Sequence, residues 1–221
     1  MKNKVIITGS TGMVGKGVLL ECLDSDKIKE VLVVNRSPID LKHPKLKEIL
    51  LKDFTQFVSI QEQLKGYDAC FHCMGVSASG LSEEKYTILT LEITKNLVDV
   101  LYSLNPDMLF NYVSGSGTDS SENGKTMWAR VKGKTENYII NKGFSKTFMF
   151  RPGVIIPEKG LQSKTKLYNT MYTIMRPFFG LLKKSKHVTT TTKLGLAMIV
   201  SLDNESESVY LENEQINKML G

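Results

Sequence analysis

The chain has 221 residues, of which 41% are hydrophobic and 24% are charged, and its formal net charge is +6. These proportions are ordinary for a globular protein and exclude a collagen-like, disordered or disulfide-dense chain. The length fits one domain of about 150 residues with an appendage.

Strand and helix signals alternate along residues 4–150. Short apolar runs predict strands buried on both faces, and apolar residues at helical spacing predict the helices between them. The predicted strands are 4–8, 30–35, 49–52, 69–74, 108–114 and 146–150. The predicted helices are 12–23, 58–64, 83–104 and 127–141. Such alternation implies right-handed crossovers, so we expect an α/β fold with a Rossmann-like, doubly wound parallel sheet and helices on both faces.

The alternation stops after Arg151-Pro152-Gly153. The elements predicted beyond it are helices near 168–175, 193–202 and 215–220, and a strand near 209–211. This tail is short for an independent domain and is expected to cap the carboxyl edge of the sheet. We therefore predict a dinucleotide-binding domain over residues 1–157 and a small substrate-side cap over 158–221.

The positive charge is concentrated in that tail. Residues 159–202 include eight basic side chains and no acidic one, whereas the rest of the chain has 21 basic and 23 acidic residues. A charge confined to one stretch argues against nucleic-acid binding by the whole protein. We expect no nucleic-acid partner, and a basic cap that favours a small anionic substrate. A peripheral membrane or nucleic-acid contact through this stretch is the weaker alternative.

A glycine-rich turn joins the first predicted strand to the first predicted helix. It reads Gly9-Ser10-Thr11-Gly12-Met13-Val14-Gly15. Gly9 suits the tight turn, Gly12 lets the backbone approach a pyrophosphate at the helix N-terminus, and Gly15 allows close packing of the helix. The order of strand, tight turn and helix predicts a dinucleotide site; a βα turn without a ligand is the alternative.

The end of the second strand bears on the choice of cofactor. About 20 residues beyond the turn, NAD-binding proteins place an acidic residue for the ribose hydroxyl. This chain has Asn35-Arg36-Ser37 there, without a carboxylate. Because an arginine pairs well with a 2′-phosphate, we expect NADP, with NAD as the less favoured cofactor. A solvated arginine at a strand end is the alternative interpretation of Arg36.

The chain resembles the short-chain dehydrogenase/reductase superfamily in its extended or atypical branch. It is most similar to small NAD(P)-binding, epimerase-like proteins related to the Tat-interacting oxidoreductase-like group. Besides the glycine-rich turn and Asn35-Arg36, the resemblance rests on Lys52-Asp53-Phe54, Cys73-Met74-Gly75, Phe110–Ser114, Val131–Glu136 and Phe150–Val154. These blocks follow one another in family order across roughly residues 4–157.

The resemblance implies a role for each block along the cofactor. Asp53 and Phe54 would lie beside the adenine, and Cys73, Met74 and Gly75 would pass close to the cofactor ribose. At the other end, Ser114 or Ser116 would lie near the substrate carbonyl, and Lys132 would hold the nicotinamide ribose. The carboxamide would be flanked by Pro152, Gly153 and Val154.

The sequence departs from the family at its Tyr-x-x-x-Lys pair. The matching frame reads Trp128-Ala129-Arg130-Val131-Lys132, so an indole replaces the tyrosine that relays a proton. A second frame, Tyr138 to Lys142, lies at the end of the same predicted helix and lacks the glutamate one turn after its lysine. We therefore interpret Tyr138 as a packing residue. The substitute acids that stay open are Tyr86, Tyr168, Tyr172 and His187.

Two functions remain open. The first is an NAD(P)-binding oxidoreductase or epimerase-like enzyme in which Ser114 or Ser116 and Lys132 are the catalytic residues. The alternative is a non-catalytic NADP(H)-binding regulatory module, which the replacement at Trp128 favours. The substrate cannot be named from the sequence, and a homodimer formed through two helices is compatible with the fold.

The cysteines and the apolar segments bear on the compartment. In a strand, Cys70 and Cys73 would lie roughly 10 Å apart, too far for a disulfide, and no second Cys/His pair completes a metal site. The most apolar late segment, 172–182, is interrupted by Arg176 and Pro177, and it is far shorter than the ~18 apolar residues of a membrane span. With no signal peptide visible, we expect a cytoplasmic protein without metal or disulfide.

Overall fold

A computed structural model describes residues 2–162, 179–182, 185–204 and 208–221. In these residues a seven-stranded parallel sheet has the order β3-β2-β1-β4-β5-β6-β9. The strands are β1 Asn3–Thr8, β2 Ile28–Asn35, β3 Leu46–Leu50, β4 Ala69–His72, β5 Leu109–Val113, β6 Lys146–Arg151 and β9 Tyr210–Glu212. The chain runs outward in both directions from β1, as in a Rossmann-like sheet, so the predicted fold class is confirmed.

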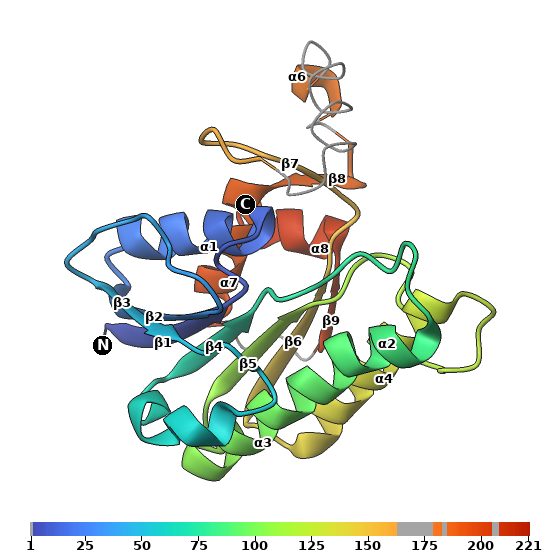
Figure 1. The fold of residues 1–221 in the computed structure, drawn as a ribbon. Coiled ribbons are helices and arrows are strands. Elements are labelled where there is room, and N and C mark those ends of the chain that lie inside the picture. The colour runs from blue at the N-terminus through green and yellow to red at the C-terminus, as the bar shows by residue number, and fades with distance from the viewer. Residues whose placement is uncertain (1, 163–178, 183–184, 205–207) are drawn as a thin grey trace.

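Helices cover both faces of the sheet (Figure 1). One layer consists of α1 Met13–Asp24, α7 Thr191–Val200 and α8 Asn213–Lys218. The other consists of the 3₁₀ helix η1 Phe57–Leu64, α2 Glu83–Thr87, the π-helical turn η2 Ile88–Glu92, α3 Ile93–Leu104 and α4 Met127–Lys142. Side chains of β1 alternate between the two cores: Val5 and Ile7 pack toward α1, and Ile6 packs toward α3.

The third and fourth strands differ from their predicted bounds for reasons of pairing. The third strand covers 46–50 rather than 49–52, because its ladder with β2 ends at the pair Asn35–Leu50. The fourth strand ends at His72 rather than residue 74. Its ladder with β1 ends at Thr8, after which Gly9 turns the chain away, and Cys73 therefore leaves the sheet.

The tail does more than cap the sheet. Helix α7 packs against α1, and β9 extends the sheet beside β6. The sequence did not predict a small two-stranded parallel sheet formed by β7 Val154–Ile156 and β8 Val188–Thr190. Among the described helices and strands of the tail, β7, β8 and α6 Phe179–Leu182 lie beyond the carboxyl edge of the large sheet (Figure 1). The helix predicted near 168–175 lies outside the described residues, and the domain boundary at residue 157 stays a prediction.

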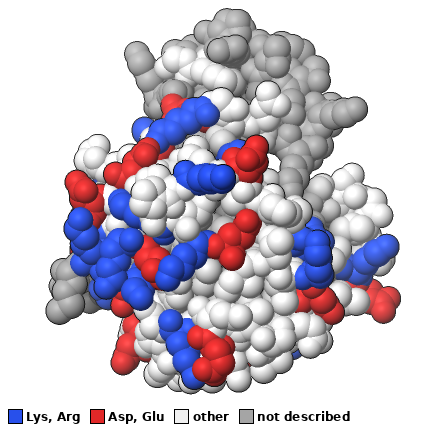
Figure 2. Space-filling view, turned by 60° about the vertical axis from the view of Figure 1, so that its left-hand side comes forward, with Lys and Arg blue, Asp and Glu red and all other residues white. Residues whose placement is uncertain are grey.

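The basic stretch is only partly described. Five of its side chains lie outside the described residues: Lys164, Lys166, Arg176, Lys183 and Lys184. Lys159 does not face the sheet edge, because its amine pairs with Glu21 at 2.8 Å and Asp24 at 2.9 Å on α1. Basic and acidic side chains are interspersed over the face in Figure 2. Within the described ranges, no helix is long and apolar enough to cross a membrane.

The glycine-rich turn yields a matched pair of stability predictions. Gly9 has φ +78°, and a Cβ there would lie 2.7 Å from the Cys73 carbonyl oxygen, whereas a Cβ on Gly75 would meet no atom within 4 Å. Gly9→Ala should therefore lower the free energy of unfolding by about 2 kcal/mol or more, and Gly75→Ala by less than about 0.5 kcal/mol. Urea unfolding measures both. Equal stabilities of the two variants would contradict the described turn.

Candidate functional site

The candidate site lies where the direction of strand order reverses, between β1 and β4. In sheets of this kind ligands bind outside the carboxyl ends of the strands at that point. The glycine-rich turn follows β1, and the segment 73–77 follows β4. A cavity of about 420 Å³ and a second of about 440 Å³ share Gly12, Met13 and residues 73–77 in their walls. They therefore form one continuous groove.

The glycine-rich turn brings the start of α1 to the floor of this groove. A Cβ on Gly15 would overlap the Gly9 carbonyl oxygen, so the helix contacts the turn backbone directly. Gly12 is the N-cap of α1, with no side-chain cap and no acidic residue in the first turn. The positive end of the helix dipole is therefore available to an external anion, such as the pyrophosphate of a dinucleotide.

Ser10 and Asn35 support the groove from behind. Ser10 is buried and donates its hydroxyl to the Asn35 side chain at 2.8 Å, and Asn35 donates to Glu48 at 2.8 Å. Glu48 also accepts the Ile39 amide at 2.9 Å. The Asn35 side chain lines the cavity, but its hydrogen bonds tie the turn to β3.

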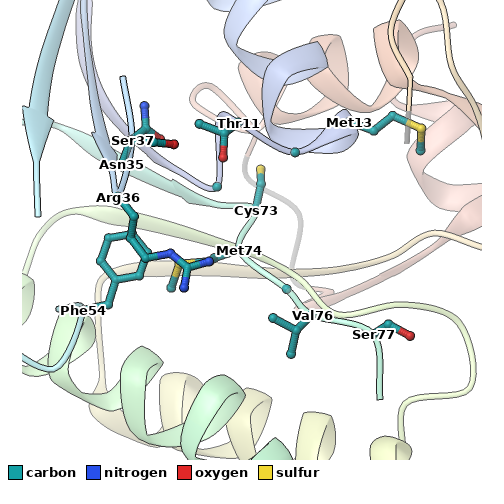
Figure 3. A pocket seen from close by; sticks show the side chains of 13 residues that line it. Thr11, Met13, Asn35, Arg36, Ser37, Phe54, Cys73, Met74, Val76 and Ser77 are labelled. Atoms are coloured by element: carbon teal, nitrogen blue, oxygen red, sulfur yellow. The ribbon is translucent and has the colours of Figure 1, made fainter. Parts of the chain in front are cut away.

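One end of the groove carries a cation stacked on an aromatic ring (Figure 3). The Arg36 guanidinium lies 5.7 Å from the centre of the Phe54 ring, and both residues line the cavity together with Ser37. Asp53 is not among the lining residues. Its exposed carboxylate accepts hydrogen bonds from the amide and hydroxyl of Thr55, which lower its pKa.

A buried histidine, which was not among the residues singled out from the sequence, anchors the end of β1. Nδ1 of His72 lies 2.6 Å from Thr8 Oγ1, and Nε2 lies 2.9 Å from Thr94 Oγ1. Thr94 donates its hydroxyl proton to the Thr90 carbonyl, so it accepts from Nε2–H, and Nδ1 accepts from Thr8. Burial lowers the pKa of His72 to about 3, so the ring stays neutral and joins the turn to α3.

Ser114 and Lys132 meet at the other end of the groove. The Lys132 amine donates to the Ser114 carbonyl, and both residues line the second cavity with Pro152 and Gly153. Burial lowers the pKa of Lys132 to about 8, although the nearby Glu136 carboxylate opposes the shift. The Ser114 hydroxyl points away from the groove and donates to Glu136 at 2.5 Å.

Glu136 belongs to a buried ionic network. Its carboxylate is fully buried and accepts two hydrogen bonds from Arg151, at 3.0 and 2.5 Å. Arg151 also contacts Glu212 at 3.3 Å and donates to Ser120 at 2.5 Å. A buried carboxylate needs such partners, so the Ser114 hydroxyl is held in a structural network.

Two predicted residues border a separate cavity of about 520 Å³, which is also walled by Gly153. Ser116 and Val154 line this cavity instead of the groove. Both residues therefore lie next to the end of the groove at which the resemblance places the nicotinamide of a cofactor.

Trp128, Tyr138 and Tyr86, the described aromatic residues considered for the proton relay from the sequence, line none of the cavities. Trp128 packs against Gly117, where a Cβ would come 3.5 Å from the indole, and it lines none of the cavities described above. Tyr138 donates to Asp99 of α3 at 2.5 Å, as expected of a packing residue. Tyr86 is buried, which raises its pKa. Tyr168 and Tyr172 lie outside the described residues.

The three cysteines are free. Cys70 is buried in β4, whereas Cys73 follows the strand and lines the groove, so the expectation that both are strand residues is wrong for Cys73. Burial raises the pKa of Cys73 to about 12. The part of the chain that the structure describes contains no cluster of three or more His, Cys, Asp or Glu side chains suited to a metal ion.

A parallel sheet with a glycine-rich turn and an uncapped helix at its switch point defines a dinucleotide-binding α/β protein. Residues 5–145 match the NAD dependent epimerase/dehydratase family, and the chain belongs to that family. The predicted relationship to the extended or atypical short-chain dehydrogenase/reductase group is confirmed.

Curated relatives agree with this assignment. Protein FMP52, mitochondrial, of Debaryomyces hansenii is 25% identical over 162 residues, covering 69% of this chain and 67% of its own length. Protein HTATIP2 of Rattus norvegicus is 24% identical over 162 residues, covering 72% of this chain and 66% of its own. The chain thus spans about two thirds of the length of these relatives.

Solved structures share the fold. MoeE5 in complex with UDP-glucuronic acid and NAD has a TM-score of 0.71 at 14% identity, covering 95% of this chain and 75% of that chain. The Bordetella bronchiseptica enzyme WbmF in complex with NAD⁺ has a TM-score of 0.69 at 14% identity, covering 98% and 77%. At this identity the similarity shows the fold alone.

The burial of Lys132 predicts a pH-dependent stability. Below pH 8 the lysine is charged in both the folded and the unfolded state, and burying that charge costs stability. Between pH 8 and 10.5 the folded state loses the proton first, so stability rises with pH. Only the parent gains this stability. The difference in free energy of unfolding between Lys132→Met and the parent should therefore change by about 1–2 kcal/mol in favour of the parent between pH 7 and pH 9.5.

Urea unfolding of both proteins at the two pH values measures this difference. Lys65→Met, in which a surface amine is removed, controls for a general effect of losing a lysine. A difference between the parent and Lys132→Met that does not change with pH would contradict the described burial of the amine.

Proposed function

We propose that the chain is an NADP(H)-dependent oxidoreductase that interconverts a small carbonyl compound and its alcohol. The observation that carries the proposal is the single groove with the Arg36–Phe54 stack at one end and the Lys132 amine at the other. This order of residues along the groove suits a dinucleotide that carries an extra phosphate on its adenosine, which would bind at the Arg36 end. A bound nicotinamide nucleotide supplies or accepts a hydride ion, and the protein supplies orientation and a proton.

The described residues fit that cofactor along its length. Arg36 would pair with the 2′-phosphate, and Phe54 would pack beside the adenine. The N-terminus of α1 would receive the pyrophosphate, because it has no side-chain cap. Lys132 would hold the nicotinamide ribose, and Gly153 would border the carboxamide.

Of the two serines left open by the sequence, Ser116 suits the substrate. The Ser114 hydroxyl is buried and already donates to Glu136. Ser116 is exposed and borders the cavity next to the nicotinamide end, where its hydroxyl can donate to a carbonyl oxygen. We therefore assign Ser116 to substrate binding and Ser114 to positioning Lys132.

The substrate that we propose is a small anionic molecule. Lys186 lines the cavity beside Ser116, and the comparison protein MoeE5 was solved with UDP-glucuronic acid, itself an anion. The cytoplasmic location and the homodimer remain proposals from the sequence. FMP52 relatives carry the description mitochondrial, which makes a mitochondrial location the alternative to test.

A non-catalytic NADP(H)-binding module is the second candidate function. It is favoured by Trp128, which replaces the tyrosine of the family and packs against Gly117 outside the groove. Turnover by the unaltered protein that is lost on Lys132→Ala would exclude this module. Tight NADPH binding without any turnover of carbonyl compounds would support it.

The Arg36 assignment predicts a change in cofactor preference. Arg36→Ala should weaken NADPH binding about 10- to 100-fold, because a charged hydrogen-bond pair is lost, and should weaken NADH binding by less than about threefold. Energy transfer from Trp128, the only tryptophan, to the reduced nicotinamide measures both affinities. Lys65→Ala is the control for removing a surface cation. Equal losses for the two nucleotides would contradict the assignment.

A further inference from the structure

The cavity beside the nicotinamide end is built from four distant segments. Its walls are Ser116, Gly153, Val154, Lys186, His187 and residues 212–215. Gly153 also lines the cofactor groove, so the two spaces meet at this residue. A small molecule in the cavity would therefore lie next to the reacting end of a cofactor in the groove.

The backbone around His187 is held firmly at this junction. The His187 carbonyl accepts the Val154 amide at 3.1 Å, and a Cβ on Gly153 would come 2.6 Å from that oxygen. The Asn213 side chain joins the same segments, because it accepts from the Gly153 amide at 3.0 Å and donates to the Lys186 carbonyl at 2.8 Å. His187 is thus fixed beside the groove, with its side chain exposed in the cavity wall.

The charged groups around His187 are of both signs. Lys186, Glu212 and Glu214 line the same cavity. Glu212 is paired with Arg151 at 3.3 Å, and Glu214 is paired with Lys218 at 2.8 Å. The pKa of Glu214 is lowered by Lys218 first, then by Lys186 and, to a smaller extent, by His187. Both carboxylates that line the cavity are therefore already paired with a cation.

Among the described residues, the other acids considered for this role are less suited to protonate a substrate. The Lys132 amine is engaged with the Ser114 carbonyl. Tyr86 and Tyr112 are buried and line none of the described cavities. The His187 imidazole is exposed in the cavity wall, where it can exchange a proton with a bound molecule and with water.

We propose that His187 is the proton donor that replaces the missing tyrosine, and that Ser116 and His187 together bind the substrate carbonyl oxygen. This inference rests on the proposed oxidoreductase function. In the reductive direction the carbonyl carbon accepts the hydride with its two electrons, and the C=O π bond breaks. The oxygen takes the proton of the His187 imidazolium, giving an alcohol, and the neutral imidazole takes a new proton from water. The oxidised nucleotide leaves as the second product.

The rate of NADPH oxidation by variants of His187 and of a control histidine tests the proton donor. NADPH oxidation is followed with pyridine-3-carbaldehyde and with glyoxylate, an anionic aldehyde. His187→Gln should lower kcat about 100-fold or more, with NADPH affinity changed less than twofold. His43→Gln, in the connection between β2 and β3, is the control.

A second readout needs no turnover. The chain has three histidines, so ¹³C-labelled imidazole resonances can be assigned by substitution. Saturation with NADP⁺ should shift the His187 resonance and leave that of His43 unmoved. A His187 resonance that does not move while NADP⁺ binds, or full kcat in His187→Gln, would overturn the inference. Failure of NADPH and NADP⁺ to bind at all would instead overturn the proposed function.

Discussion

The close approach of three backbone segments at the end of β1 is the constraint on which the groove depends. Gly9 turns the chain against the backbone of Cys73, and Gly15 brings α1 against the Gly9 carbonyl. Side chains at these points would separate β1, α1 and the segment after β4. Because the three segments meet, the uncapped start of α1 faces the crevice at which the strand order reverses.

The opposite end of the groove depends on charge rather than on close backbone contact. Glu136 is fully buried, and Arg151 neutralises it while also reaching Glu212 at the end of β9. This network links the floor beneath Lys132 to the wall of the neighbouring cavity. The network thereby ties β9, at the edge of the sheet, to β6 and α4.

Regular patterns made most of the fold predictable. The apolar run Val31–Val34 and the glycine-rich turn indicated a buried strand and a tight βα connection, and both are present. The short strands β7 and β8 could not be predicted, because three residues carry no periodicity and their partner is distant in sequence. The π-helical turn within the predicted helix 83–104 was likewise invisible, since its spacing differs little from that of an α-helix.

The site was predictable as a groove but not in the direction of each side chain. The blocks around Arg36, Phe54 and Lys132 do line it. Sequence reasoning could not show that Asp53 turns to its own loop, or that Ser114 turns to Glu136, because both depend on partners brought together by folding. His187 was one of four candidates for the substitute acid, but the sequence could not place it, since its position in the cavity wall comes from the pairing of β7 with β8.

The occupant of the groove is most directly tested by a crystal structure of the protein soaked with NADP⁺. The groove predicts electron density for the adenosine 2′-phosphate at Arg36, the pyrophosphate at the first turn of α1 and the nicotinamide beside Lys132 and Gly153. Density for the dinucleotide in the reverse direction or at another surface would contradict this assignment. So would an empty groove at a nucleotide concentration that saturates other members of the family.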